Sequence, residues 1–432
     1  MSENLELLLH NLRVPTDYAR IQHITEDSAL VHLDEWKDSA ERVLTELELI
    51  LNQKNLELSL NSQADVIQAA ASFDGQDSWV TPIGRTTAQG ILRHFDDLPQ
   101  SQLTQILNHN VKPLFQFNPH PNLNASGRKL PRPAGGPMAT HDFYDDQMWK
   151  AAPGVVNLVS WCIRHVHRDW YETLWHLVIP PVMALLDDFE AHNKLRGVGI
   201  VSEMLREVPS QLLRRTGVDG LIRSSLNTCL THLNDTETPQ LIEAAVDAYL
   251  TLTLLTTEVG SSEQFDQLCA LLGEGVIRGI WLYASDRPDV VLASLRALPP
   301  LLRTLKIGNA RFLKVLITQL LHPLKTNVAS PWLDDIQIAS LRLLSILIEE
   351  CAPCIPRWKT TILDAVARCW VTLKDSGKTC RRFLIRDHLA AYDVTMTALV
   401  LPAGLNSALR HTCNLLGQCV MMEVRRSTVS CP

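Results

Sequence analysis

Residues 332–350 have the sequence WLDDIQIASLRLLSILIEE, in which apolar side chains recur at three- and four-residue steps. One stripe contains Trp332, Ile336, Ala339, Leu343 and Leu347, and it is widened by Ile338, Leu341 and Ile348. This spacing predicts an α-helix. Because the apolar arc is so broad, the helix must contact neighbours on more than one side, as the inner helices of a stacked array do.

The same periodicity continues along most of the 432-residue chain. It predicts helices over residues 28–54, 59–72, 84–96, 101–109, 153–167, 169–186, 188–206, 217–233, 238–257, 261–284, 286–305, 309–326, 332–350, 355–374, 378–401 and 404–426. Aromatic residues make up only 6%, which favours helix over strand. Hydrophobic residues at 46% and charged residues at 20% exclude a chain that is disordered throughout.

An acidic residue stands at the start of every second helix in the later part of the chain. These residues are Asp187, Asp235, Asp286 and Asp334, separated by 48, 51 and 48 residues. Asp is favoured there because its carboxylate accepts from the free N–H groups of a helix N-terminus. A two-helix unit of this length is close to the ~40–47-residue period of HEAT and armadillo repeats. We predict an all-α, HEAT/armadillo-like α-solenoid of about five helix pairs; the alternative is an irregular bundle with accidental spacing.

One unit also shows a HEAT-like residue pattern. Pro180, Asp188 and Lys194 match a kinking proline, a turn acid and a basic residue on the second helix. In that pattern the acid and the base can bridge adjacent repeats.

Charge and proline content divide the chain into three parts. Residues 1–117 carry 17 acids and 8 bases, whereas the remainder carries 30 acids and 32 bases. Five prolines within residues 118–140 cannot sustain a helix. We predict a smaller, acidic helical N-terminal region at 1–117, a Pro/Gly-rich linker or loop at 118–146, and the solenoid at 147–432.

Overall composition excludes several classes of function. The net charge of −7 argues against a general nucleic-acid binder. No apolar run reaches the ~20 residues of a membrane-spanning helix. The N-terminal sequence MSENLELLLH lacks the basic flank of a signal peptide, so the ten cysteines are expected to be reduced thiols in the cytosol or nucleus.

The chain contains fragments of catalytic and metal-binding motifs, but none is complete. Residues 376–379 end like a phosphate-binding loop, yet Thr372 occupies the position of its first glycine. Cys351 and Cys354 form a CxxC without the second pair that structural zinc needs. We therefore predict no catalytic residue, no cofactor and no metal site; a metal-dependent enzyme built on these cysteines is the alternative.

The most distinctive charged feature is a basic cluster near the C-terminus, a candidate protein-interaction site for an acidic or phosphorylated segment. It contains Lys374, Lys378, Arg381, Arg382 and Arg386. The alternative is a solvated loop and helix start.

Residues 144–215 resemble the TELO-two-interacting protein two family. The residues that carry the resemblance, in order, are Tyr144, Trp149, Lys150, Pro153, Trp161, Trp170, Asp187, Asp188, Asn193, Lys194 and Gly197. Residues 79–82, Trp-Val-Thr-Pro, are also similar to that family. We expect most of the aromatic residues to lie in the core of the first repeat.

The resemblance implies a HEAT-like protein without catalytic activity, in the cytoplasm and nucleus. It would be the smallest subunit of the TTT complex, bound most directly to a large HEAT-repeat partner. With the ninety-kilodalton heat-shock chaperone and the R2TP adaptor, that complex helps phosphatidylinositol-3-kinase-related kinases to mature. The alternative that the fold alone allows is a general HEAT adaptor in transport or phosphatase scaffolding.

Overall fold

The structure is a computed structural model that describes residues 2–23, 26–52, 58–135, 143–144, 147–326 and 331–375. Within these ranges the regular elements are helices, and strand-like pairing is limited to an isolated bridge between Leu123 and Lys129. The all-α prediction is confirmed. The chain forms two compact units, Met1–Leu301 and Leu302–Pro432.

The first unit contains most of the described helices. They are α1 (Ser2–Asn11), α2 (Asp27–Leu51), α3 (Leu60–Ala71), α4 (Pro82–Arg93), α5 (Gln100–Ile106), α6 (Lys112–Phe115), α8 (Val155–Arg164), α9 (Tyr171–Leu186), α10 (Ala191–Glu207), α11 (Ser210–Thr216), α12 (Val218–Cys229), α13 (Thr238–Thr256), α14 (Ser262–Ala270) and the start of α15 (Pro288–Leu305).

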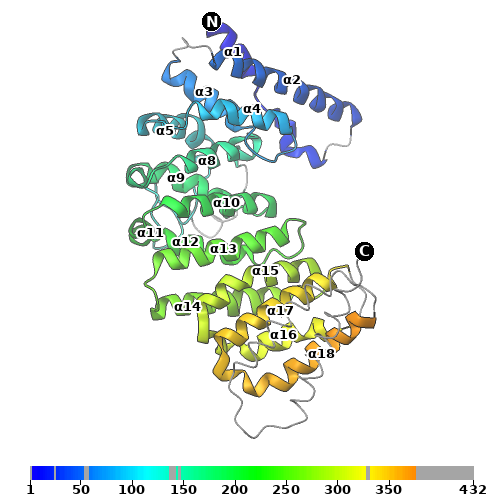
Figure 1. The fold of residues 1–432 in the computed structure, drawn as a ribbon. Coiled ribbons are helices and arrows are strands. Elements are labelled where there is room, and N and C mark those ends of the chain that lie inside the picture. Colours follow the sequence, from blue (N-terminus) through cyan, green and yellow to red (C-terminus); the bar gives the residue numbers. More distant parts are fainter. Residues whose placement is uncertain are drawn as a thin grey trace. The chain divides into compact units, whose positions relative to one another are not determined.

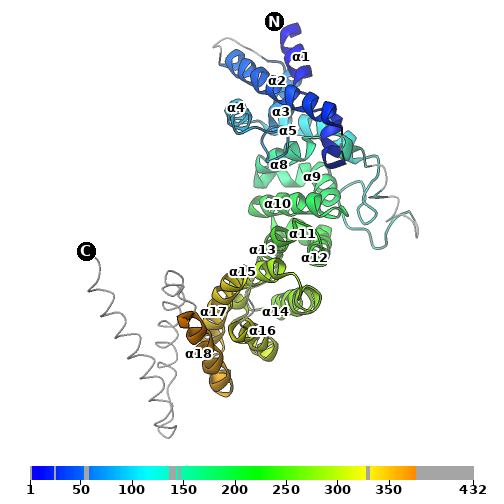
Figure 2. The ribbon, with the colours of Figure 1, turned by 90° about the vertical axis from the view of Figure 1, so that its right-hand side faces the viewer.

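Helices of this unit stack in consecutive pairs (Figures 1 and 2). Helix α9 packs against α10, and α12 packs against α13. Helix α12 also contacts α9, and α13 contacts α10, so equivalent helices of neighbouring pairs lie against each other. The N-terminal helices continue the stack because α3 packs against α8. This is the arrangement of the predicted α-solenoid.

Asp187 and Asp235 lie in the turns before α10 and α13, and the N-terminal capping role predicted for these two acids is wrong. The N-cap residues of α10, α13 and α17 (Leu333–Glu350) are Glu190, Glu237 and Trp332, and none of these side chains makes a capping hydrogen bond. Helices α10 and α13 begin several residues after Asp187 and Asp235. Asp187 and Asp235 therefore belong to the turns, whereas Asp334 lies in the first turn of α17, near the positive end of the helix dipole, as predicted.

The apolar periodicity of the sequence did not predict the short and irregular helical elements. Helices α1 and α11 were not predicted; α11 has seven residues, too few to show a repeating pattern. The predicted helix over 261–284 is α14 followed by a π-helix, η5 (Leu271–Trp281).

The second unit is described for α16 (Leu313–Lys325), α17 and α18 (Lys359–Asp375), and α16 packs against both of the others. The broad apolar arc of α17 is buried at Ala339, Leu341, Leu343, Leu347 and Ile348. Trp332 was wrongly included in this stripe: it lies at the helix N-terminus and is 41% exposed. The predicted helices over 378–401 and 404–426 lie outside the described residues.

Residues 118–135 form no helix and fold back onto the first unit. The backbone N–H of Ala134 donates to the carbonyl of Pro121, and that of Lys129 donates to the carbonyl of Thr216, at the end of α11. The compact units divide elsewhere, after Leu301. The division of the chain into 1–117, 118–146 and 147–432 stays a prediction.

Candidate functional site

The turn between α9 and α10 holds several of the residues that carry the resemblance. Asp188 is 2% exposed, and its carboxylate lies 2.6 Å from Lys150 Nζ. It also accepts hydrogen bonds from the Glu190 backbone N–H at 2.9 Å and from the Asn193 amide at 3.1 Å. These partners offset the cost of burying the charge. Because Lys150 belongs to the 3₁₀ helix η3 (Met148–Ala151), the pair ties this turn to the segment before α8.

The predicted bridge between Asp188 and Lys194 is absent from the described contacts. Lys194 is 3% exposed, and its Nζ donates to the carbonyl of Leu186, at the C-terminal end of α9, at 3.2 Å. Its positive charge therefore stabilises the C-terminal end of α9, within its own helix pair. The basic partner of Asp188 is Lys150 instead.

Asp187 anchors the loop at 118–135. Its Oδ2 lies 2.8 Å from Nε2 of His120, whose side chain is buried. Burial, followed by the charges of Asp187 and Asp188, raises the pKa of the nearby Tyr144 hydroxyl.

The tryptophans that carry the resemblance are buried or half-buried. Trp149 is buried and stacks on Phe115, with ring centroids 5.8 Å apart. Trp161 is buried and stacks on His165 at 4.1 Å. Trp170 is half-buried at the start of α9. Such aromatic pairs stabilise packing through contact area and ring geometry.

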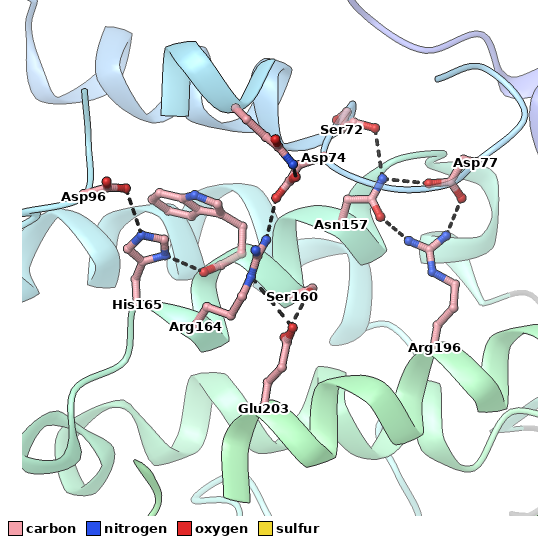
Figure 3. Close-up of polar contacts among 12 residues, drawn as sticks. Ser72, Asp74, Asp77, Asp96, Asn157, Ser160, Arg164, His165, Arg196 and Glu203 are labelled. Atoms are coloured by element: carbon pink, nitrogen blue, oxygen red, sulfur yellow. Dashed lines mark hydrogen bonds and ion pairs between the residues drawn. The ribbon is translucent and has the colours of Figure 1, made fainter. Parts of the chain in front are cut away.

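A second polar cluster joins the acidic N-terminal region to α8 and α10 (Figure 3). Arg164 Nη2 lies 2.6 Å from Asp74 Oδ2, and the Arg196 guanidinium pairs with Asp77. Asn157 completes the set: its amide donates to Asp77 at 2.8 Å, and its carbonyl oxygen accepts from Arg196. We call these five residues the junction cluster. Both aspartate side chains are less than a tenth exposed, so the pairs are largely shielded from solvent.

Glu203 of α10 adds further contacts to this network. It accepts a hydrogen bond from Ser160 at 2.9 Å and lies 3.9 Å from Arg164 Nε. Burial raises the pKa of Glu203, although Ser160 and Arg164 act in the opposite direction.

Sequence reasoning missed the junction cluster because the residues that contact each other in it are up to 119 positions apart. A usable signal was present: Asp77 lies two residues before the 79–82 stretch that the resemblance includes.

Cys351 and Cys354 lie in the turn after α17, where Cys354 ends the 3₁₀ helix η7 (Ala352–Cys354). Cys351 is buried, and its Sγ donates to the carbonyl of Lys306. Burial, together with Cys354 and Glu350, raises the pKa of this thiol to about 11, so it is protonated at neutral pH and a weak metal ligand. Within the described ranges, no group of three or more His, Cys, Asp or Glu side chains could hold a metal ion.

The basic interaction candidates fall where the structure gives no side-chain description. Lys378, Arg381, Arg382 and Arg386 lie outside the described residues, and for Lys374 only the backbone, in α18, is described. None of the helices in the described part combines the length and apolarity needed to cross a bilayer.

The stacked pairs and their buried polar ties define a helical-repeat protein of the HEAT-like class. Residues 66–330, more than half of the chain, match the model of the Tti2 family. The chain belongs to this family, which confirms the resemblance. The match begins inside α3 and therefore includes the junction cluster.

Curated relatives match over a shorter stretch. The chain is 29% identical over 69 residues to human TELO2-interacting protein 2 and 28% identical over 64 residues to its mouse counterpart. These alignments cover 16% and 15% of this chain, and 13% and 12% of the relatives. No solved structure matches the chain.

Proposed function

We propose that this chain is a non-catalytic scaffold subunit of the TTT complex. The observation that carries the proposal is the Tti2 family match over residues 66–330. The names of the human and mouse relatives support an interaction with a TELO2-like protein. A stacked helical array presents a long surface on which another chain can lie, which suits a scaffold.

In this role the chain binds the two other TTT subunits, most directly the large HEAT-repeat partner. Through them it assists the heat-shock chaperone and R2TP machinery in the maturation of phosphatidylinositol-3-kinase-related kinases. It acts in the cytoplasm and nucleus and needs neither nucleic acid nor membrane. The residues that carry the resemblance support the packing around α8, α9 and α10 rather than contact the partner. They are Trp149, Lys150, Trp161, Trp170, Asp187, Asp188, Asn193, Lys194 and Gly197.

Affinity purification of the tagged full chain, followed by mass spectrometry, tests this proposal. We expect to recover a TELO2-like protein and the third TTT subunit. A Lys150→Ala variant, which weakens the turn between α9 and α10, should recover less of both. Recovery of transport cargo or phosphatase subunits in their place would point to the general HEAT adaptor.

The basic cluster is proposed as a contact region within this assembly. We expect Arg381→Glu combined with Arg382→Glu to lower partner recovery because charge reversal replaces attraction by repulsion. Arg303→Glu combined with Lys314→Glu is the control, since it changes the net charge of the chain equally at two exposed bases. Equal recovery with both double variants would remove the cluster from the interface.

A further inference from the structure

The loop at 118–135 builds one wall of a surface hollow whose other walls are α9 and α11. The hollow has a volume of about 480 Å³ and is lined by Ala125, Ser126, Arg128, Glu172, Trp175, His176, Leu212, Arg215 and Thr216. A space of this size falls within the usual range for ligand and peptide sites. It lies within the first compact unit.

The loop wall is held rigidly. Asn124 Oδ1 accepts from the backbone N–H of Ser126 at 3.0 Å and of Arg128 at 2.9 Å, which closes a tight turn. Gly127 has a φ of +72° within this turn, and its carbonyl accepts from Trp175 Nε1 at 2.8 Å. The turn is therefore fastened to α9, and Arg128 is presented from a fixed backbone.

The charged groups that line the hollow are mainly cationic. Arg128 and His176 are exposed, and their side chains have no hydrogen-bond or ion-pair partner among the described residues. Arg215 pairs with Glu172 at 2.8 Å, but both side chains are more than half exposed. An exposed pair of this kind contributes little, so an incoming carboxylate can replace Glu172 on Arg215.

We propose that this hollow binds an acidic segment of a partner protein. Arg128 and Arg215 would hold its carboxylates through charge-assisted hydrogen bonds, since guanidinium groups match carboxylates in geometry. This goes beyond the scaffold role, which would hold whether or not the hollow is used.

A nucleic acid fits the same hollow less well. Single-stranded nucleic acid needs accessible aromatic faces on which its bases stack. Trp175, the aromatic residue of the lining, is only 4% exposed.

Fluorescence anisotropy with the full chain and a labelled peptide of eight glutamates tests the proposal. We expect Arg128→Glu and Arg215→Glu each to weaken binding by about tenfold. The matched control is Arg214→Glu, one position away on α11: its side chain is 52% exposed like that of Arg215 and pairs with Glu263, but it does not line the hollow. It should change affinity by less than about twofold. Glu172→Gln should tighten binding because it frees Arg215 without reversing a charge.

Several outcomes would overturn the proposal. Equal losses with Arg214→Glu and Arg215→Glu would show diffuse attraction rather than a site. Equal affinity for a peptide of eight glutamines would show that the negative charge of the peptide does not determine binding. An oligothymidylate that binds more tightly than the peptide and depends on Arg128 would identify a nucleic-acid site instead. Circular dichroism of each variant verifies folding, which these exposed substitutions should leave intact.

Discussion

Gly197 shows how one residue sets the approach of two helices. A Cβ at this position in α10 would lie 2.6 Å from the backbone nitrogen of Leu186 and 2.7 Å from the carbonyl carbon of Leu185. Both atoms belong to the backbone of α9, which cannot rotate away as a side chain can. Contact between the two helices at this point therefore depends on the absence of a side chain.

We expect Gly197→Ala to lower the free energy of unfolding by about 1–3 kcal/mol through overpacking. Gly199 lies two positions further along the same helix, is exposed and has nothing within 4 Å of a Cβ. Gly199→Ala should raise stability by up to about 1 kcal/mol because alanine favours helix. Urea unfolding of both variants measures the difference, and a change of the same sign in both would contradict this explanation.

Glu203 leads to a pH-dependent prediction. Because burial raises its pKa in the folded chain, the folded state keeps a proton that the unfolded state releases at intermediate pH. The contribution of this group to stability therefore falls as pH rises from the ordinary carboxyl pKa to the raised one. Glu203→Gln removes this titration and keeps an acceptor for Ser160.

Relative to the natural chain, the Glu203→Gln variant should gain stability as pH rises through the window between the ordinary carboxyl pKa and the raised one. Urea unfolding at several pH values in that window measures the trend. The same substitution at Glu274, whose side chain is 64% exposed, is the control. A constant difference across the window would show that ionisation of Glu203 does not affect folding.

At the scale of elements, the turn between α9 and α10 depends on a residue from outside the pair. Lys150→Ala leaves the carboxylate of Asp188 buried without its cationic partner, and we expect it to cost about 2–4 kcal/mol. Arg278→Ala is the comparison, because Arg278 pairs with Glu274 at the surface and should contribute less than about 1 kcal/mol. Thermal and urea unfolding distinguish these values; similar losses would mean that Asp188 is satisfied by the turn alone.

At the scale of the molecule, the junction cluster determines whether the acidic N-terminal region unfolds separately. Asp77→Ala removes the carboxylate that Arg196 and Asn157 share. We expect native-state hydrogen exchange to speed up in α3 and α8 by a similar free energy, because both helices belong to one cooperative unit. If α3 loses protection while α8 keeps it, residues 1–117 form the separate region that the composition predicts.

Helices and their buried faces were predictable from the sequence wherever the apolar periodicity extended over several turns. The arc of α17 gave the right helix and the right buried face, since a period of 3.6 needs only the local sequence. The same pattern failed at Trp332, because periodicity does not show where the N-terminus places a side chain. It also missed α11, whose seven residues span only about two turns.

The sequence by itself determined the helices, their repeating order and the class of fold, because hydrophobic periodicity and turn residues act over short distances along the chain. Only the tertiary structure decided that Asp77 meets Arg196, that Lys150 rather than Lys194 neutralises Asp188, and that the proline-rich loop forms a cationic hollow with α9 and α11. Those contacts join residues far apart in sequence, and their partners depend on how stacked helices are placed, which no local spacing encodes.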